Sequence, residues 1–420
     1  MMRNYCRVVV SQRMMIILCL GFSSGLPFPL ISGTLSAWYT TAGVSLLSIG
    51  ILSLVQLPYL FKPLWAPILD RFSPFRLGRR RSWLLLSQLC IAVSLFLMST
   101  FSPQHHPQLL AYMAFMVAFF SASQDIAYDA YRTDLLSVKE RGLGSAMVSV
   151  GYRVAILVSG SLALVMASVW GWYWVYLLMA ILMLTQVVVS WLSPVIDKDI
   201  APSNFRQAVI MPFSVFFKQN HALWILIFII LYKLADAFAL SLSTTFLIRG
   251  IGFSLADIGV AMKLSAMSAS LLGALIGGIW MIRLSHYQAL FIFGVLQALS
   301  NVGYLLLVIF GHVMALMIAA VFIEYFCGGL ASVAFVAYLM SLCHQRYTAT
   351  QYALFSALAS VGRVLIGPLA AWVAQHWGWL DYFSISILLG FPVLLLLWWM
   401  NHGLGLFEVD PKLHTLPRVN

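Results

Sequence analysis

The sequence predicts an all-α integral membrane protein whose twelve transmembrane helices form two six-helix halves. Three observations lead to this fold class: the composition, the lengths of the apolar runs and the distribution of basic residues. Of the 420 residues, 62% are hydrophobic and only 9% are charged, whereas a soluble globular chain carries about 25% charged residues. The chain lacks the polar surface that a water-soluble body needs, so it must lie in a lipid bilayer.

The apolar runs are long enough to be helices that cross the membrane. The hydrocarbon core is about 30 Å thick, so a helix needs about 20 residues to span it. Runs of this length, rather than alternating ten-residue strands, argue against a β-barrel. The first run follows three arginines but is too long for a signal peptide, so we expect an uncleaved first span. The twelve expected spans cover residues 14–38, 45–69, 83–101, 108–131, 143–168, 171–193, 222–248, 255–281, 287–310, 313–340, 351–375 and 380–401.

The basic residues give the orientation of these spans. Of the 24 Lys and Arg residues, 18 fall in the termini and gaps of one side, Arg249 alone falls on the other side, and five lie inside or at the edges of spans. Cytoplasmic loops carry the excess of Lys and Arg, so we expect both termini in the cytoplasm. The alternation also supports the count, since one missed span would scramble it.

Several classes of function are disfavoured by the same residues. The net charge of +11 does not indicate nucleic-acid binding, because the basic residues sit in short gaps between apolar runs. The five cysteines show no paired spacing, so we expect no disulfide framework, no metal site and no cofactor. No H-E-x-x-H, G-x-S-x-G or P-loop motif occurs, and His105 and His106 fall in a short external loop. We therefore expect a protein that is not an enzyme.

An internal repeat divides the chain at its midpoint. The segment SVGYRVAILVSG at 149–160 resembles SVGRVLIGP at 360–368, at an offset of about half the chain, and the longest polar connection lies between the halves. Two six-helix halves with a central cytoplasmic linker follow the parallel-repeat plan of major facilitator transporters. We expect an N-terminal bundle at 1–196, a linker at 197–220, a C-terminal bundle at 221–402 and a short cytoplasmic tail at 403–420.

The gap between spans 2 and 3 reads LDRFSPFRLGRRRSW (69–83) and resembles the cytoplasmic loop signature of that superfamily. The resemblance implies that Asp70 and Arg71, with Arg79 and Arg80, form ion pairs that close one conformer. The alternative is that this basic cluster only sets the topology.

Ionisable residues inside membrane spans are functional candidates by default, because an ionised side chain at mid-bilayer costs a few kcal/mol. Asp125 and Asp129 share one helix face at i,i+4 spacing. Burial and mutual repulsion both favour the protonated form, as a proton-coupled carrier needs. The alternative for Asp129, near the cytoplasmic end, is a structural pair with a loop arginine. For Asp125, which lies deeper, we expect a role in coupling or substrate binding.

The remaining ionisable residues within the spans lie in the second half, except for Arg153, which lies in the repeated segment of the first half. Lys233 and Asp236 are spaced i,i+3, so they either neutralise each other or take part in transport. Glu324 has no partner in its own helix and needs one from elsewhere. Lys263, Arg153 and Arg363 are the candidates, and the sequence does not choose among them. Arg153 and Arg363 occupy equivalent repeat positions, where each either binds an anionic substrate or joins helices.

Uncharged polar residues and aromatic rings also recur within the spans. As a population they suggest a roomy polar cavity, although any one of them can instead join helices or belong to an interfacial belt. The candidates for substrate contact among them are Trp38, Gln124, Tyr128, Asn301 and Gln351. Gly and Pro in GLPFPL (25–30) and PYLFKPLWAP (58–67) predict broken helices that line a transport path, whereas GALIGG (273–278) predicts close helix packing.

Longer motifs resemble one family within that superfamily. The stretches GFSSGLPFPLISGTLSAW, FKPLWAPILDRFSPFRLGRRRSWLL, SASQDIAYDAYRTDLLSVKERGLGSAM and YKLADAFALSLSTTFLIRGIGFS are similar to AmpG-type muropeptide permeases, as are FIEYFCGGLASVAFVAYLMSLC and ATQYALFSALASVGRVLIGP. The resemblance implies that six residues within these motifs correspond to residues of the family's motifs: Asp125, Asp129, Lys233, Asp236, Glu324 and Gln351. Several family members are longer and carry extra spans beyond the twelve.

The resemblance implies a monomeric inner-membrane carrier of Gram-negative bacteria. Such a carrier imports N-acetylglucosaminyl-1,6-anhydro-N-acetylmuramyl peptides with the proton gradient, for cell-wall recycling and β-lactamase induction. The alternative is a paralogue that carries an acetyl-CoA-like, siderophore-like or drug solute. Bringing an anion into a negative-inside cell costs about 2.3 kcal/mol per charge per 100 mV. Co-transported protons offset that cost, and they need an intramembrane carboxylate; the candidates are Asp125, Asp129, Asp236 and Glu324.

Overall fold

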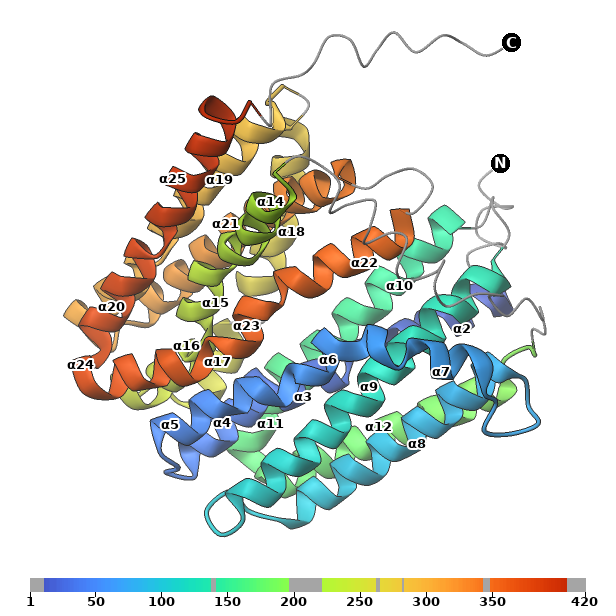
Figure 1. The fold of residues 1–420 in the computed structure, drawn as a ribbon. Helices are drawn as coiled ribbons and strands as arrows, with labels where there is room; N and C mark the ends of the chain where they lie inside the picture. Colours follow the sequence, from blue (N-terminus) through green and yellow to red (C-terminus); the bar gives the residue numbers. More distant parts are fainter. Residues whose placement is uncertain are drawn as a thin grey trace, which may run out of the picture.

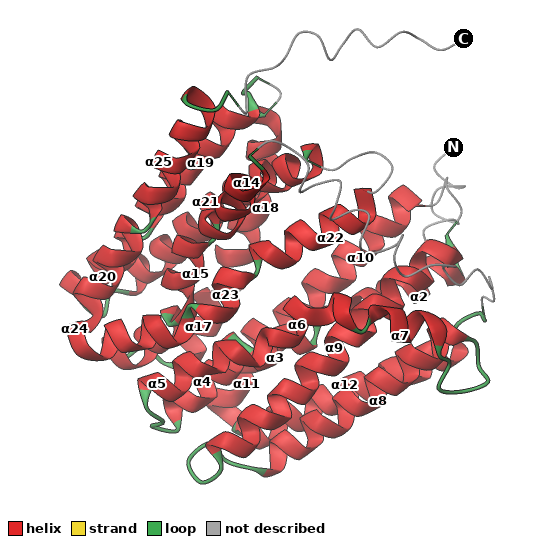
Figure 2. Ribbon diagram, in the orientation of Figure 1, coloured by secondary structure: helices red, strands yellow, loops and turns green. Residues whose placement is uncertain are grey.

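The computed structural model describes residues 11–136, 141–195, 221–261, 265–281, 283–342 and 348–405, and within these ranges the chain is helical and holds no strand (Figure 2). The predicted linker 197–220 and nearly all of the predicted tail 403–420 lie outside the described residues. So do Lys263 and the side chains of Asp70, Arg71 and Gln351. The predicted all-α fold class is confirmed.

The first half contains six helical passages, several of them segmented. The first passage consists of α2 (Gln12–Gly25), α3 (Pro27–Ile31) and α4 (Gly33–Thr41). The second consists of α5 (Leu46–Ile51), η1 (Leu52–Gln56), α6 (Leu57–Phe61), η2 (Lys62–Leu64) and α7 (Ala66–Arg71). The other four are α8 (Arg79–Thr100), α9 (Pro107–Leu135), then α10 (Arg141–Ile156) with η3 (Leu157–Leu162) and α11 (Ala163–Trp170), and α12 (Trp172–Leu192).

The second half repeats this plan. Its first passage consists of α14 (Ala222–Tyr232), α15 (Leu234–Ser241), α16 (Ser243–Thr245) and η5 (Phe246–Ile251). Its second consists of α17 (Leu255–Ala261) and α18 (Met267–Trp280). The next are α19 (His286–Ser300) with α20 (Val302–Phe310), and α21 (Met314–Ser341). The last are α22 (Thr348–Ala359), α23 (Val361–Leu365), α24 (Gly367–Leu388) and α25 (Gly390–His402).

The lengths of these helices are consistent with twelve spans. Nine described helical stretches are long and apolar enough to cross a membrane, and Leu46–Phe61 and Met267–Trp280 are shorter apolar helices. One of the nine, Leu354–His402, is 49 residues long and is broken at Gly378, where φ is 82°. It therefore contains two passages, which meet between the predicted spans 351–375 and 380–401.

The predicted helix breakers act where the sequence places them. Span 1 is divided at Leu26 and Ser32, on either side of the segment that contains Pro27 and Pro29. Span 2 changes from α to 3-10 geometry and back around Pro58. Proline has no backbone N–H to donate and its ring clashes with the preceding turn, so it interrupts the regular hydrogen-bond ladder.

The two halves meet mainly at one side of the molecule. We call the side that carries Arg13, Arg80, Arg132 and Arg283 the basic side, and the side with the turns at Gly43, Gly171, Gly311 and Gly378 the opposite side. Between the halves, α5 packs against α24, α11 against α17, and α4 against α16. All three pairs lie toward the opposite side, and Figure 1 shows the ribbons of the two halves diverging from there toward the basic side.

Small residues allow this close contact between the halves. A Cβ atom at Gly50 would lie 2.5 Å from the Ala371 side chain, and a Cβ at Gly367 would overlap the backbone of Gly50. The side toward the basic residues lacks such a seam in the described helices. The structure is therefore closed at the opposite side.

Candidate functional site

Asp125 is held by the first half and faces the region between the halves. It lies on α9 and is half-buried. The Ser24 hydroxyl on α2 donates a hydrogen bond to Asp125 Oδ1 at 2.6 Å. Lys62, from the broken second span, is the cation that interacts most strongly with this carboxyl group. We call Asp125 with Ser24, Tyr59 and Tyr152 the Asp125 site.

Arg363 approaches the Asp125 site from the second half. Its guanidinium lies over the ring of Phe28 on α3, 4.8 Å from the centroid. Its charge also acts on Tyr59 and Tyr152, the two tyrosines on which the Asp125 charge acts. The Arg363 side chain is solvent-accessible although protein surrounds it, so it faces the space between the halves. The Tyr59 hydroxyl is buried there.

Arg153 occupies the equivalent repeat position in the first half but has a different environment. It lies on α10 and is half-buried. Among the described residues it makes no hydrogen bond or ion pair. The structure therefore distinguishes two arginines that the repeat makes equivalent, because only Arg363 reaches across to the other half.

Asp129 is one turn from Asp125 and points elsewhere. Its side chain is 57% exposed and forms an ion pair with Arg132 Nη2 at 2.9 Å, on the same helix at i,i+3. Arg132 also lies over the ring of Tyr128 at 5.8 Å. This arrangement favours the structural interpretation of Asp129, a pair near the basic side, although the partner belongs to its own helix rather than to a loop.

Three predicted substrate residues of the first half are engaged in packing. Gln124 Nε2 donates to Ser23 Oγ at 2.9 Å, and the Tyr128 hydroxyl donates to the Ile17 carbonyl at 3.0 Å. Both bonds join α9 to α2. Trp38 is buried, stacks with Trp172 at a centroid distance of 5.7 Å and lies tilted against Tyr176 at 4.8 Å. In this conformation these side chains join helices, which is the alternative that the sequence left open.

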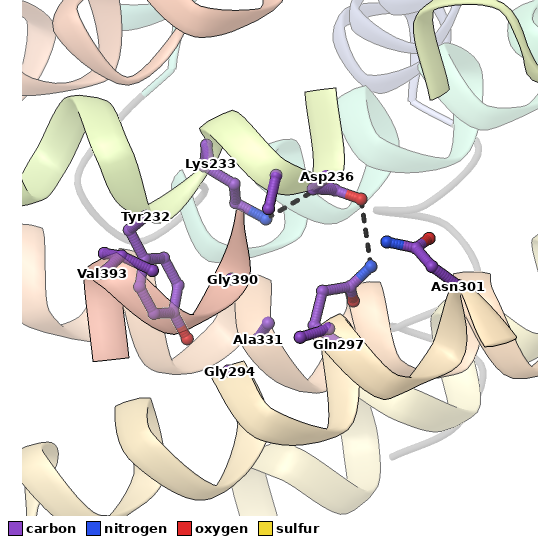
Figure 3. Close-up of a pocket in the computed structure, with 11 residues that line it drawn as sticks. Tyr232, Lys233, Asp236, Gly294, Gln297, Asn301, Ala331, Gly390 and Val393 are labelled. Atoms are coloured by element: carbon purple, nitrogen blue, oxygen red, sulfur yellow. Dashed lines mark hydrogen bonds and ion pairs between the residues drawn. The ribbon is translucent and has the colours of Figure 1, made fainter. Parts of the chain in front are cut away.

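The second half holds a cluster of charges around Asp236 (Figure 3). Lys233 Nζ lies 3.8 Å from Asp236 Oδ2 and donates a hydrogen bond to Ser332 Oγ at 3.1 Å. Gln297 Nε2 donates to Asp236 Oδ1 at 3.0 Å. The predicted i,i+3 pair is therefore formed. Lys233 occupies the junction between α14 and α15, and its bond to Ser332 reaches α21 whereas the bond of Asp236 reaches α19.

Glu324 joins this cluster from α21. It is 2% exposed, and the Tyr304 hydroxyl donates to Glu324 Oε2 at 3.4 Å. It interacts electrostatically with Asp236 and Lys233. Of the partners expected from sequence, Lys263 lies outside the described residues. Among the described residues neither Arg153 nor Arg363 forms an ion pair with Glu324, and Arg363 lies over the Phe28 ring of the first half instead. We call Lys233, Asp236, Gln297, Tyr304 and Glu324 the Asp236 cluster.

A small cavity borders the Asp236 cluster, and Asn301 is one of its walls. It has a volume of about 20 Å³, which is room for about one water molecule and too little for a substrate. Asn301 is 1% exposed, and its Oδ1 has no hydrogen-bond partner in the described structure.

Tyr304 and Gln297 were not singled out as site residues from sequence, yet Gln297, Asn301 and Tyr304 recur at helical spacing and share one face of span 9.

The predicted gating loop is described in part. Arg80 Nε lies 3.9 Å from Asp134 Oδ2 at the end of α9, so the start of span 3 contacts the end of span 4. Arg81 donates to the Trp191 carbonyl on α12. Arg79 begins α8, and its Nε is buried without a hydrogen-bond partner in the described structure. All these contacts lie within the first half.

Comparisons with known proteins give the family. The model of the Major Facilitator Superfamily matches residues 14–367. The anhydromuropeptide permease of Escherichia coli (strain K12) is 47% identical over 399 residues, which are 94% of this chain and 81% of that protein. Putative transporter AmpG 4 of Rickettsia conorii is 30% identical over 94% of this chain and 98% of its own length. An uncharacterized protein of Haemophilus influenzae is 38% identical, covering 93% of this chain and 95% of that protein.

Solved structures support the fold independently. The D-xylose-proton symporter matches with a TM-score of 0.71 at 11% identity, over 92% of this chain and 97% of that chain. The nucleoside transporter NupG matches with a TM-score of 0.69 at 13% identity, over 92% of this chain and 99% of that chain. At these identities the likeness shows the fold alone.

Proposed function

We propose, from the premise that this chain belongs to the anhydromuropeptide permeases of the Major Facilitator Superfamily, that it imports anhydromuropeptides together with protons. The observation that carries the proposal is the 47% identity to the Escherichia coli permease over 94% of the chain. The proposed direction is from periplasm to cytoplasm, with both termini in the cytoplasm of the inner membrane. The basic side is then the cytoplasmic side, as the distribution of Lys and Arg supports.

The substrate site that we propose lies between the halves. An anhydromuropeptide carries peptide carboxylates and sugar rings. Arg363 supplies a planar, permanently charged fork that matches a carboxylate, and it is solvent-accessible in the closed-outside conformation. Phe28, Tyr59 and Tyr152 supply aromatic faces and hydroxyl groups beside it. Asp125 lies against the same tyrosines and provides an acceptor for the substrate's donors.

The proton site that we propose is the Asp236 cluster. Two carboxyl groups and one ammonium group lie together there, and Glu324 is enclosed. If all three were ionised, one negative charge would remain uncompensated in a water-poor site, which is costly. One shared proton on the Asp236 and Glu324 carboxyls removes that cost. The cavity beside the cluster has room for about one water molecule, which would let the proton exchange.

Uptake into membrane vesicles tests the proposal. Energised right-side-out vesicles that contain the protein are incubated with radiolabelled anhydromuropeptide, with and without a proton uncoupler. We expect accumulation that collapses with the uncoupler and is not inhibited by excess nucleoside or D-xylose. Vesicles from cells that lack the protein are the control. Accumulation that survives the uncoupler would overturn the proton coupling and keep the cargo.

A cellular measurement tests cargo and physiology together. The chain is expressed in an enterobacterial strain that lacks its own muropeptide permease and carries an inducible β-lactamase. We expect restored induction and reduced loss of wall fragments to the medium. A chain that is inserted in the membrane but restores neither, and shows no uptake in vesicles, carries another solute.

We propose that the working unit is a monomer, which is checked by reconstitution at one copy per nanodisc.

A further inference from the structure

Arg249 has an unusual place in the molecule. It is the one Lys or Arg that the sequence places on the side opposite the basic side. It lies in η5, a π-helical segment that ends span 7. π-Helical turns are rare and often mark functional positions. Arg249 belongs neither to the Asp125 site nor to the Asp236 cluster.

The Arg249 side chain binds the other half of the protein. Its Nη2 donates to the Thr40 carbonyl at 2.7 Å and to the Tyr39 carbonyl at 3.2 Å, and its Nε donates to the Thr40 carbonyl at 3.0 Å. Tyr39 and Thr40 lie in the last turn of α4. Carbonyl groups at a helix C-terminus lack intrahelical partners and carry the negative end of the helix dipole. The guanidinium therefore meets a matched acceptor.

A second bond reinforces this contact one turn earlier. Thr245 lies four residues before Arg249, and its hydroxyl is 2.9 Å from the Thr40 hydroxyl in a buried contact between the halves. The neighbouring seam of α5 and α24 is formed by small residues in close packing. A further polar bond between the halves runs from Ser53 Oγ in η1 to the Val364 carbonyl in α23 at 2.7 Å, farther from the opposite side.

We propose that Arg249 is the latch of the outer gate. Its bonds to Tyr39 and Thr40 hold the halves together on the opposite side. They must break when that side opens to receive cargo. The latch rests on family membership and on these contacts, not on the identity of the cargo. A residue at the rim suits this role, because its guanidinium is partly exposed and returns to water when the gate opens.

Distance measurement between the halves tests the latch without substrate. Spin labels are placed at Gln104→Cys, in the outer loop of the first half, and Asp381→Cys, at the outer end of the last span, after the native cysteines are replaced. Both positions are exposed. In the unsubstituted background we expect one dominant short distance. Arg249→Gln should add a longer distance and shift the closed-to-open ratio by about tenfold, the size of one charged hydrogen bond.

Three further variants sharpen the result. Thr245→Val removes only the hydroxyl bond and should shift the ratio in the same direction by less. Arg249→Lys keeps the charge without the fork and should fall between. Arg283→Gln removes an exposed arginine from the basic side and should leave the distances unchanged. If the Arg249→Gln and Thr245→Val proteins fold and their distance distributions are unchanged, the latch is overturned and the cargo proposal is untouched. If the distances shift but the protein takes up no anhydromuropeptide, the cargo proposal is overturned and the latch stands.

Discussion

The Asp125 site and the Asp236 cluster show how differently one protein can hold an aspartate inside a membrane. Asp125 is half-buried, receives one hydroxyl hydrogen bond at 2.6 Å and faces the space between the halves. Asp236 lies within one half, between a lysine at 3.8 Å and a glutamine at 3.0 Å, with Glu324 enclosed nearby. The first arrangement suits contact with a solute, and the second suits storage of a proton. Both side chains are partly buried, so position relative to the two halves and local charge balance, rather than residue type, separate the two proposed roles.

The largest expected effect is a loss of stability when a substitution removes the charge balance of the Asp236 cluster. Lys233→Met leaves two carboxyl groups without their cation and should lower the free energy of unfolding by about 3 kcal/mol, as for a buried pair that loses one partner. Lys233→Met with Asp236→Asn should recover most of that loss. Thermal unfolding of both variants in detergent measures the difference. If the double variant were no more stable than the single one, charge balance would not be what holds the cluster.

The next effect concerns coupling. Glu324→Gln keeps the shape of the side chain and removes the proton site, so accumulation should fall by about 50-fold per coupled charge at 100 mV. Exchange of labelled for unlabelled substrate across de-energised vesicles should persist. Tyr304→Phe, which removes only the hydroxyl donor, is the matched control and should keep most of the accumulation. Equal loss of exchange and accumulation would assign Glu324 to folding instead.

A smaller effect is expected at the space between the halves. Arg363→Gln should weaken substrate binding by about tenfold, the cost of one charged hydrogen bond. Arg363→Lys should recover little, because a point charge does not match a carboxylate with two bonds. Arg153→Gln at the equivalent repeat position should change binding less. Competition binding with labelled substrate compares the three variants, and equal losses at both arginines would remove the distinction between them.

The smallest effect is expected at Asp129. Asp129 is 57% exposed and its partner Arg132 is 36% exposed, and exposed ion pairs contribute about 0–1 kcal/mol. Asp129→Asn should therefore change uptake by less than about twofold, while Asp125→Asn in the same assay should lower it by about tenfold. Initial uptake rates measured side by side make this comparison. A larger loss at Asp129 than at Asp125 would reverse the roles that we give the two residues.

The sequence predicted the spans better than the partners of the buried charges. Pro27, Pro29 and Pro58 broke helices where expected, and the Lys233–Asp236 pair formed at i,i+3. Both features depend on neighbours along the chain. The partner of Glu324 did not follow from sequence, because Tyr304 comes from another helix whose rotation no local pattern fixes. Gln124 and Tyr128 were candidates for substrate contact, yet their partners Ser23 and Ile17 lie on a helix about 100 residues away.

The sequence by itself determined that the chain lies in a membrane and crosses it repeatedly, and it determined which side carries the basic residues. Hydrophobicity and charge act residue by residue, so their sums can be read without a structure. Only the tertiary structure decided that Arg363 and not Arg153 reaches the other half, that Arg249 binds Tyr39 and Thr40, and that Glu324 joins Asp236. Hydrogen bonds depend on distances of a few tenths of an ångström between helices distant in sequence, and packing alone sets those distances.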